Sequence, residues 1–413
     1  MKNFKTIILG GGASGCMAAL RAKEKDIAII DGGTQLAKKL LVTGNGKCNL
    51  TNVDIDTQPN EKFYNQDLKK YFYKFNVEDT LNFFAHLGLE VVSDEQDRVY
   101  PISKTAVSVQ DVLIREIEKK DINVFLEQKV VALKKENNKF LIKTATNDFS
   151  CDKLVFCLGG QGIELLKDLQ VSIKEKHPSL CALKTSKNKN LAGRRLEDVL
   201  VTAKDKNGNV FSEMGEVLFK EDGLSGIVIF NLSSLFARQG VFEGEVSIDM
   251  LPNFTHKELE EKLLARRTLN VGVSQFFVGL LANAFAYLIF DKCNTNEQRN
   301  SKELTEKEIK EFVKVIKALK FNVTGYYDNN QVFSGGALLS TLDENCQSKE
   351  VENLYICGEA CDVDGVCGGY NLQWAWTSGF IAGGQIWLSL NKLKLKLVLT
   401  SVKLKLKLQK IWT

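Results

Sequence analysis

The chain has 413 residues, 44% of them hydrophobic and 26% charged, and a formal net charge of +4 at pH 7. Its length allows two or three domains, and its composition is that of a globular enzyme. Seven of the 55 basic residues lie in 391–413, which leaves 48 basic against 51 acidic residues elsewhere, a net charge of −3. This balance argues against polyanion binding by the chain outside 391–413. A local basic patch around residues 184–195 is still possible.

Cysteine usage and hydropathy indicate the compartment. The ten cysteines follow no framework of paired spacings, which favours reduced thiols over disulfides. The apolar run at the N-terminus is short and opens directly into a glycine-rich motif, so we expect no signal peptide. Residues 271–290 approach the ~20 residues of a membrane span, yet they contain Ser274, Gln275 and Asn283, and we expect a buried or lid helix. These features predict a cytoplasmic protein without a transmembrane segment.

The N-terminal residues predict the start of a dinucleotide-binding fold. Residues 4–9 are apolar and β-branched, as expected for a buried parallel strand. Gly10, Gly12 and Gly15 follow with the GxGxxG spacing. The first glycine allows a tight turn, the second lets the backbone approach a pyrophosphate, and the third lets the helix pack on the strand. The helix predicted over 13–25 would direct its N-terminal N–H groups at the phosphates.

A second strand, predicted over 27–30, ends in Asp31. This residue stands twenty-one positions after Gly10, where an acidic side chain accepts hydrogen bonds from ribose hydroxyls. Strand, helix, second strand and acid together favour a ligand-binding unit over a glycine-rich turn without a ligand. The unit alone does not distinguish NAD from FAD.

Residues 42–52 form a loop dense in glycine, asparagine and threonine. Such a loop can wrap closely around a planar ring or a phosphate. Cys48 stands beside Lys47, whose charge would favour the thiolate form. An ordinary surface loop with a buried thiol explains the same residues equally well, so the pattern alone leaves both interpretations open.

Residues 77–160 predict two helices and three strands. The helices have apolar residues near helical spacing, and two strands alternate around a turn at Asn137-Asn138. The last strand ends in Gly159-Gly160, which suits a strand that passes under a cofactor. The predicted ranges are 77–87 and 107–119 for the helices and 124–134, 139–145 and 154–158 for the strands.

The character of the chain changes after His177-Pro178. Asn207-Gly208 between apolar runs is a strong hairpin signal, and two capping boxes predict helix starts. This region therefore predicts a β-rich insert that carries a helical subdomain. Strands are predicted over 199–204, 210–211 and 246–250, helices begin at the pairs Thr255/Glu258 and Thr305/Glu308, and Gly223–Gly226 opens a further helix.

Residues 333–339 and 354–357 return to the pattern of the dinucleotide fold. A glycine-rich loop over 358–365 then leads into a helix that begins near Gly369 and runs to about Ile386. The start of this helix would present N–H groups and partial positive charge, and facing a flavin pyrimidine it would favour reduction of the ring. Two such helix starts at opposite ends of the chain indicate one cofactor held by both, which makes FAD the leading cofactor.

Residues 391–413 have low complexity, with Lys-Leu-Lys-Leu-Lys-Leu at 392–397 and again at 403–408. Strict alternation favours an amphipathic strand over a helix. We expect a poorly ordered appendage, because the last helix has already completed the fold.

Other chemistries find little support in the sequence. Cys357, Cys361 and Cys367 lack the spacing and the histidine of a zinc site, so we predict no metal ligand. The three histidines lie far apart, which argues against a hydrolytic triad. No Cys-x2-Cys or Cys-x4-Cys pair suggests a disulfide reductase, and no second complete GxGxxG marks a domain for NAD(P)H.

Together, the motifs resemble those of the BaiN-like family of bacterial FAD-dependent oxidoreductases, also called aminoacetone-oxidase-like. The similarity covers nearly all of residues 4–388, and it implies an α/β fold. A discontinuous FAD-binding Rossmann-like domain of the two-dinucleotide-fold type would carry an inserted β-barrel-like domain and a helical subdomain. The motifs are Gly10–Gly15, Thr43–Asn52, Arg98–Pro101, Gly223–Gly226, Ser334–Gly336 and Gly358–Gly383.

We predict an FAD-binding domain over 1–183 and 331–388, a β-rich insert over 184–250 and 319–330, a helical subdomain over 251–318, and a tail over 391–413. The tail has no counterpart in the family. Two further departures are the short connection Gln161-Gly162-Ile163 after Gly160, and Cys346-Gln347-Ser348-Lys349 in place of Met-Glu-Ser-Lys.

The resemblance implies that residues 43–52 contact the flavin and that Glu359 and Asp362 lie near its ribityl chain or pyrophosphate. Cys48 is the first candidate for a catalytic proton donor and Tyr100 the second. The predicted FAD-binding residues are Gly10, Gly12, Ala13, Ser14, Gly15, Asp31, Gly32, Lys39, Thr43, Gly44, Gly46, Lys47, Cys48, Asn49, Val130, Gly159, Gly160, Gly358, Glu359, Asp362, Gly369, Tyr370, Asn371 and Leu372.

The predicted function is that of an FAD-dependent oxidoreductase. Hydride would pass from flavin N5 to a polarised C=C bond, while the protein supplies position and a proton donor. The resemblance implies a steroid-like small molecule or a uracil ring of large-subunit ribosomal RNA as substrate, and NAD(P)H is a candidate electron donor. Three alternatives stay open: an amine or amino-ketone oxidase, an rRNA-associated flavoprotein that modifies a base or uses the flavin structurally, and a flavoprotein without activity.

Overall fold

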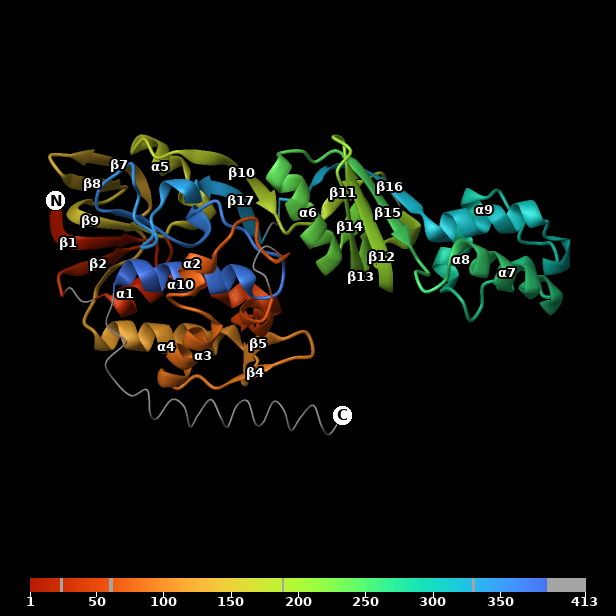
Figure 1. Ribbon diagram of the computed structural model, residues 1–413, viewed down its shortest axis with the longest axis horizontal. Coiled ribbons are helices and arrows are strands. Elements are labelled where there is room, and N and C mark those ends of the chain that lie inside the picture. Colours follow the sequence, from red (N-terminus) through yellow and green to blue (C-terminus); the bar gives the residue numbers. More distant parts are fainter. Residues whose placement is uncertain (23–24, 59–61, 188, 329–330, 385–413) are drawn as a thin grey trace. The chain divides into compact units, whose positions relative to one another are not determined.

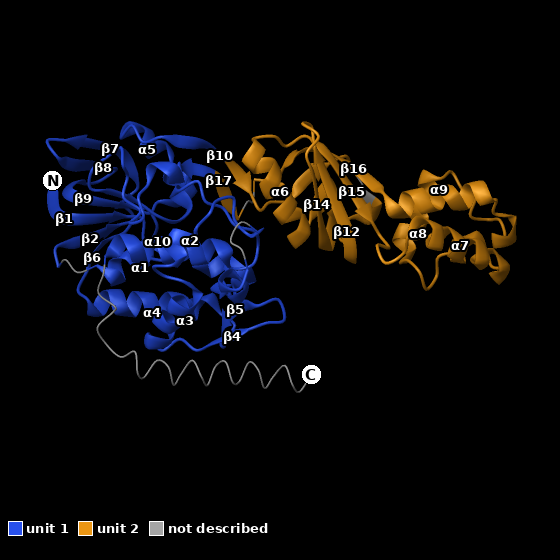
Figure 2. Cartoon of the chain, in the orientation of Figure 1, with its two compact units in different colours: residues 1–176, 335–413 blue, residues 177–334 orange. Residues whose placement is uncertain are grey.

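The computed structural model describes residues 1–22, 25–58, 62–187, 189–328 and 331–384. The chain forms two compact units, Met1–Lys176 with Gly335–Thr413, and His177–Ser334 (Figure 2). The first unit is built from both ends of the chain, and the second is one continuous insertion. The expectation for the tail 391–413 lies outside the described residues, and the domain boundaries given above stay predictions.

A seven-stranded mixed sheet lies at the centre of the first unit (Figure 1). Its strands are β1 (Lys2–Leu9), β2 (Ile27–Ile30), β6 (Asn123–Phe125), β7 (Val130–Glu136), β8 (Lys139–Thr144), β9 (Asp148–Phe156) and β18 (Leu354–Ile356). The order is β6-β2-β1-β9-β8-β7, and β18 also pairs with β9. β1 is parallel to β2 and β9, and β18 is parallel to β9, with Ile356 opposite Phe156. The first and last strands of this unit therefore share one sheet.

Helices and a small second sheet complete this unit. The helix α1 packs against α10, so a helix from each end of the chain lies side by side (Figure 1). The sheet order β3-β5-β4 brings residues of the 43–52 loop beside residues near position 100. The bounds are α1 (Ala13–Arg21), α2 (Lys69–Phe72), α3 (Val77–His86), α4 (Ala106–Lys119), α5 (Glu164–Asp168), α10 (Tyr370–Gly383), β3 (Thr51–Asn52), β4 (Val91–Ser93) and β5 (Arg98–Pro101).

The second unit consists of a closed barrel and a group of helices. The barrel order is β11-β14-β13-β12-β15-β16, and its core contains many phenylalanines, such as Phe219, Phe285 and Phe321. The bounds are β11 (Leu183–Thr185), β12 (Arg195–Asp205), β13 (Val210–Lys220), β14 (Gly223–Ser225), β15 (Gly244–Asp249), β16 (Leu319–Tyr326), α6 (Ile227–Gln239), α7 (His256–Arg266), α8 (Asn283–Lys292) and α9 (Glu306–Lys317).

Short 3-10 helices and one strand pair account for other connections. β10 (Ile173–Ser179) and β17 (Val332–Ala337) form a two-stranded sheet. The 3-10 helices include Lys38–Gly46, Val53–Asp56, Gly159–Gly162, Lys189–Leu191, Arg267–Leu269, Val273–Gln275, Ser301–Glu303, Leu339–Thr341 and Gly358–Ala360.

Most expected elements are confirmed. The strand over 27–30 is observed to the residue, and the hairpin at Asn207-Gly208 joins β12 to β13. Both capping boxes form, because Thr255 and Thr305 accept hydrogen bonds from the N–H groups of Glu258 and Glu308. Local polar signals of this kind need no long-range contact, which is why the sequence reveals them.

Two expectations for the first unit are wrong in extent. The helix expected over 13–25 ends at Arg21, because Ala22 turns to an extended backbone with ψ 143°. The strand expected over 124–134 is two strands, β6 and β7, at opposite edges of the sheet. Between them Glu127 has φ 57°, and the N–H of Gln128 donates to the carbonyl of Asp31. The chain therefore turns there to cover the end of β2.

Two further expectations are corrected. Residues 271–290 are no single helix: a 3-10 turn at Val273–Gln275 and α8 are separated at Gly279, which has φ 79°. Among the described residues, no helix combines the length and apolar character needed to cross a membrane. Residues 333–339 do not join the parallel sheet, since β17 pairs with β10 instead.

Candidate functional site

The turn between β1 and α1 has the geometry of an anion site. A Cβ atom on Gly15 would lie 1.8 Å from the carbonyl oxygen of Gly10, so the packing of helix on strand requires glycine there. No described atom lies within 4 Å of a Cβ placed on Gly12, and no side chain caps α1 at this N-cap residue. The uncapped first turn, which begins with Ala13 and Ser14, and the open space before it fit a pyrophosphate.

Asp31 follows β2 and faces the same turn. Its Oδ2 accepts a hydrogen bond of 2.6 Å from the N–H of Gly11, and its Oδ1 accepts one of 2.6 Å from the N–H two residues later. The carboxylate thus fixes the turn, and each oxygen retains a lone pair that a ribose hydroxyl can use. A Cβ on Gly32 would lie 3.3 Å from the Cα of Lys129, which places Gly32 next to the start of β7 at Val130.

The C-terminal glycine-rich loop reaches the same place. The N–H of Gly358 donates to the hydroxyl of Ser378 at 2.9 Å, and its carbonyl accepts a hydrogen bond from the Trp374 indole at 3.0 Å. A Cβ on Gly358 would lie 2.8 Å from the hydroxyl oxygen of Ser14. Since Ser14 belongs to α1 and the other two belong to α10, the two ends of the chain form one site.

The loop 43–52 is tied to the start of α10. The Thr51 hydroxyl donates to Oε1 of Gln373 at 2.6 Å, and the Asn52 amide donates to the carbonyl of Gly368 at 3.1 Å. The Trp376 indole donates to the carbonyl of Leu50 at 2.9 Å. These hydrogen bonds bring together the two motifs that are most specific in the sequence.

Gln373 is a positioning residue that the sequence reasoning missed. Its buried amide donates to Thr80 at 2.8 Å and Thr377 at 3.0 Å while accepting from Thr51. It therefore joins α3, α10 and β3. The sequence feature that could have identified Gln373 is its place in the 358–376 motif. It stands four residues after Gly369, one helical turn from the start of α10.

A second link crosses the site through an ion pair. Nζ of Lys39 lies 2.7 Å from a carboxylate oxygen of Glu359, with the lysine 59% and the glutamate 19% exposed. A Cβ on Gly159 would lie 3.7 Å from the same carboxylate, and the carbonyl of Gly160 accepts a hydrogen bond from Lys176 at 3.2 Å. The structure thus brings together the predicted residues Lys39, Gly159, Gly160 and Glu359.

Several predicted contact residues use their side chains to support the loop. The Tyr370 ring stacks on Phe63 with centroids 4.5 Å apart. The Asn371 amide exchanges two hydrogen bonds with the backbone of Gly365, at 2.8 and 2.9 Å. The buried Asp362 carboxylate accepts from Asn65 at 3.3 Å and from Gln66 at 3.4 Å. Leu372 is half-buried against the core.

The 43–49 segment passes from exposed residues at 44–47 to buried residues at 48 and 49. Gly44, Gly46 and Lys47 are exposed, whereas Cys48 and Asn49 are buried. The half-buried Thr43 donates from its hydroxyl to the carbonyl of Leu40 at 2.7 Å. The exposed stretch therefore carries the glycines and Lys47, and the buried stretch that follows anchors the loop in the unit.

Both candidate proton donors stay protonated at neutral pH. Burial raises the pKa of the Cys48 thiol to about 12, against the smaller opposing effect of a hydrogen bond with Thr43. The thiolate bias expected from Lys47 is therefore wrong. Burial also raises the pKa of Tyr100, which is half-buried. A Cβ on Gly44 would lie 3.3 Å from the Tyr100 ring, so the ring packs on the same loop.

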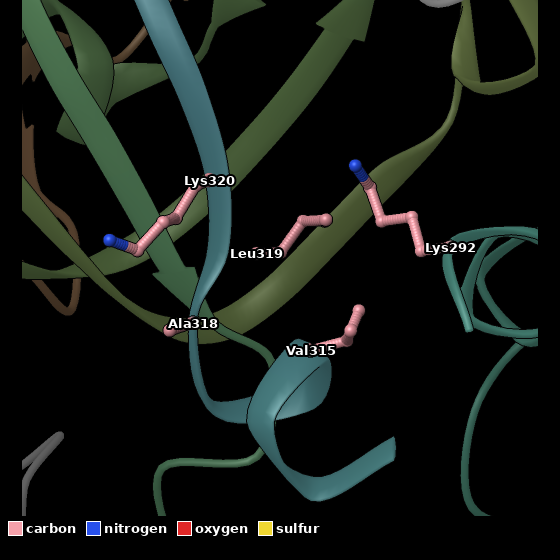
Figure 3. A pocket seen from close by; sticks show the side chains of 5 residues that line it. All are labelled: Lys292, Val315, Ala318, Leu319 and Lys320. Atoms are coloured by element: carbon pink, nitrogen blue, oxygen red, sulfur yellow. The ribbon is translucent and has the colours of Figure 1, made fainter. Parts of the chain in front are cut away.

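The described residues outside this site provide weaker candidates for ligand binding. Among the described residues, no group of three or more His, Cys, Asp or Glu side chains could hold a metal ion. A pocket of about 280 Å³ in the second unit is lined by Lys292, Val315, Ala318, Leu319 and Lys320 (Figure 3). It contains none of the predicted site residues, and the Lys320 ammonium already lies 3.0 Å from Glu245.

Comparison with known proteins gives consistent matches along the chain. The family model described as HI0933-like protein Rossmann domain matches residues 4–385. A 3-dehydro-bile acid delta(4,6)-reductase of Clostridium scindens is 29% identical over 404 residues, covering 91% of this chain and 97% of the relative. A ribosomal RNA dihydrouridine synthase of Escherichia coli K12 is 26% identical over 401 residues, covering 92% of this chain and 96% of that relative.

A solved structure gives a likeness of fold. The 3-ketosteroid delta1-dehydrogenase from Sterolibacterium denitrificans has a TM-score of 0.50 and 10% identity, covering 93% of this chain and 99% of that chain. The expected fold and the resemblance drawn from the motifs are confirmed, and the donor set at the two helix starts fits the expected cofactor. The chain belongs to the HI0933-like Rossmann-domain family of FAD-dependent oxidoreductases, and FAD is its cofactor.

Proposed function

We propose that the protein reduces an activated carbon–carbon double bond in an apolar small molecule. The observation that carries this proposal is the convergence of α1, the 43–52 loop and α10 on one site, through contacts such as Gly358 with Ser14 and Thr51 with Gln373. Bound FAD supplies hydride transfer. A C. scindens relative named as a bile acid reductase supports a steroid-like substrate.

The residues have separate tasks in this proposal. The first turn of α1 binds the pyrophosphate, and Asp31 accepts hydrogen bonds from the ribose. The loop 43–52 and the start of α10 position the ring and exclude water from it. Addition across a C=C bond also needs a proton at the second carbon, and a neutral phenol or thiol can donate it. The partial exposure of Tyr100 favours it over the fully buried Cys48.

A second candidate substrate is a uracil ring in RNA. It is supported by the 26% identity to a protein named ribosomal RNA dihydrouridine synthase. The net charge of −3 outside 391–413 disfavours it, because nucleic-acid binding relies on neutralised phosphates. The small-molecule substrate is therefore the leading proposal.

Single-turnover kinetics test the proposal. The purified holoprotein is reduced chemically without oxygen and mixed with a steroid enone, with an rRNA fragment, or with buffer, while flavin absorbance is followed. Rapid reoxidation by the enone, with a product that has gained two hydrogens, is the expected result. Reoxidation on mixing with oxygenated buffer but not with the enone, together with anaerobic reduction of the oxidised flavin by an amine, would instead identify an oxidase.

The proton donor is tested by two variants. Tyr100→Phe should slow reoxidation by the enone by about 10²-fold or more, the usual contribution of a general acid, without loss of bound FAD. Cys48→Ala should retain most of the rate. The reverse order of effects would make Cys48 the donor.

A further inference from the structure

Two segments of the first unit are basic and contain no acidic residue. Residues 35–53 and 98–110 include five basic side chains, namely Lys38, Lys39, Lys47, Arg98 and Lys104, and no aspartate or glutamate. Without these five, the 48 basic residues outside 391–413 fall to 43, against 51 acidic ones, a net charge of −8. The two segments therefore differ in sign of charge from the rest of the chain outside 391–413.

The structure brings the two segments together. β3 pairs with β5, and Thr51 lies opposite Val99 in this pair. The buried amide of Gln110 donates to the carbonyl of Leu36 at 2.7 Å, and the 3-10 helix Lys38–Gly46 packs against α4. We call the exposed residues of both segments the basic face.

Most of the positive charge on the basic face is available to a partner. Two of the five basic side chains form ion pairs, with Glu359 at 2.7 Å and with Asp94 at 2.8 Å. The other three, Lys38, Lys47 and Lys104, are exposed and form no ion pair with any residue that the structure describes. An acidic partner could therefore approach them without breaking an internal contact.

Exposed apolar side chains accompany these lysines. Val42, Ile102 and Val107 are 76%, 58% and 47% exposed, and they are three of the six large hydrophobic side chains exposed in the described part of the first unit. None of the three is among the predicted FAD-binding residues, so the predicted cofactor contacts do not account for their exposure. Apolar groups with a charged rim are typical of a surface that binds another protein.

The proposed reaction needs a source of electrons. Each reduced C=C bond takes two electrons from the flavin, and these must be replaced before the next turnover. The sequence has one complete GxGxxG, at Gly10–Gly15, and a domain for NAD(P)H would need a second. Electron-carrier proteins bind their partners through small, weakly held interfaces, and opposite charges raise the rate of such encounters.

We propose that the basic face is the docking surface for a small acidic electron-carrier protein that reduces the bound flavin again after each turnover. This inference rests on the proposed function, because a reductase must regain the electrons that it gives to its substrate. The carrier is oxidised by two electrons, in one step or as two one-electron carriers in turn, and both electrons pass to FAD with a proton from solvent. Val42 directly precedes the loop 43–52 that is predicted to contact the flavin, so docking there brings the carrier to that loop.

Two variants and a matched control test the basic face. Lys38→Glu reverses a charge, and Ile102→Ser removes an exposed apolar side chain. Lys143, an exposed residue of β8 outside the basic face, provides the control, because Lys143→Glu makes the same change in net charge. All variants retain residues 391–413, so any attraction of that lysine-rich segment for the carrier is common to them. The probes are an acidic bacterial ferredoxin and an acidic bacterial flavodoxin, each reduced and then freed of reductant by gel filtration.

Binding and electron transfer are measured separately and without an enone. Calorimetry gives the dissociation constant of each oxidised carrier for the oxidised holoprotein, and anaerobic stopped-flow absorbance gives the rate of flavin reduction by each reduced carrier, by NADH and by NADPH. We expect a carrier to be the fastest donor for the wild type. Lys38→Glu should lower that rate about tenfold at low salt and make it less dependent on ionic strength. Ile102→Ser should weaken binding and leave the salt dependence unchanged, and Lys143→Glu should match the wild type.

Three results would overturn the inference. They are the absence of flavin reduction by both carriers, faster reduction by NADH or NADPH, and an equal loss of rate in Lys143→Glu and Lys38→Glu. Failure of the proposed function looks different, because chemically reduced protein would then fail to reduce an enone while the carrier still docked and reduced the flavin. An active enone reductase whose flavin accepts electrons only from a nicotinamide would remove this inference alone.

Discussion

At the scale of the residue, the site depends on backbone more than on side chains. The first turns of α1 and α10 offer N–H groups, while Tyr370, Asn371 and Asp362 direct their side chains into the supporting structure. Side-chain identity at these positions therefore preserves the shape of the loops. The sequence predicts that these residues belong to the site and does not predict which of their atoms face a ligand.

Gly369 is a position in the site at which a single added methyl group should be strongly destabilising. Ala there would meet the backbone of Thr51 at 2.6 Å with φ 100°, so we expect a loss of about 3 kcal/mol in stability and a preparation poor in FAD. Gly88 is the matched control, with φ 80° and no described atom within 4 Å of an added Cβ. Gly88→Ala should cost about 1 kcal/mol and leave FAD bound. Urea unfolding and flavin content measure both, and equal losses would contradict the clash.

Sequence reasoning succeeded where the signal is local. The glycine spacing at 10–15, the hairpin at Asn207-Gly208 and both capping boxes are read within a few residues. It failed where distant contacts decide. The amides that hold Asp362 come from residues 65 and 66, almost 300 positions away, and the turn that separates β6 from β7 depends on a hydrogen bond to Asp31.

At the scale of the element, α10 organises the first unit. Its indoles at 374 and 376 donate to carbonyls of the two glycine-rich loops, and its amide at 373 binds β3 and α3. Side chains on both sides of the helix thus make hydrogen bonds to neighbouring segments. This explains why the helix carries no charged residue between Tyr370 and Gly383. A helix buried in this way depends on satisfied polar groups.

Replacing Gln373 by Leu should expose that dependence. The change keeps the approximate volume but leaves the hydroxyls of Thr51, Thr80 and Thr377 without this partner, so we expect a loss of about 2–4 kcal/mol in the free energy of unfolding. Thr80→Val removes only one acceptor and should cost about 1 kcal/mol. Denaturant titration compares the two, and a neutral Gln373→Leu would show that the network contributes nothing to stability.

The start of α9 should show a dependence on pH. A hydrogen bond from Arg299 lowers the pKa of Glu308 from 4.5 to about 2. A carboxyl whose pKa is lowered on folding stabilises the protein above its unfolded pKa, and that stabilisation disappears as pH falls from 4.5 towards 2. Glu308→Gln retains the capping box, so it should cost about 1 kcal/mol at pH 7. Urea unfolding should show the gap to wild type closing below pH 4.5; a constant gap would contradict the assignment.

At the scale of the whole molecule, the two units differ in connectivity. Residues 177–334 are continuous and have their own core, in which Phe277, Phe290 and Phe312 meet. The first unit needs segments from both ends of the chain, since β18 pairs with β9. The insertion can therefore be separated from the rest, whereas the sheet that holds the cofactor cannot be divided.

Residues 177–334 expressed alone should fold. The barrel is closed by pairing of β11 with β16 within this segment, so the barrel itself has no open edge for aggregation. We expect a cooperative thermal transition and no bound flavin. A broad, non-cooperative transition would show that the insertion depends on the first unit.

Removal of residues 391–413 should alter surface charge and leave the site intact. The deletion changes the net charge from +4 to −3, so retention on a heparin column should fall, because polyanion binding follows positive charge. Flavin content should not change, since the site residues all precede 385. Loss of flavin on truncation would assign the tail a role in the fold.

The pairing of β18 with β9 also determines when the first unit can fold during synthesis of the chain. The ribosome releases the N-terminal glycine motif first, yet Ser14 cannot meet Gly358 until almost the entire chain has emerged. The barrel strands of the insertion, which all lie within 183–326, are complete earlier and can fold while translation continues. Cofactor loading is therefore a late event, and any product of premature termination before residue 358 is colourless. Flavin bound to the purified protein therefore requires a chain that extends through α10.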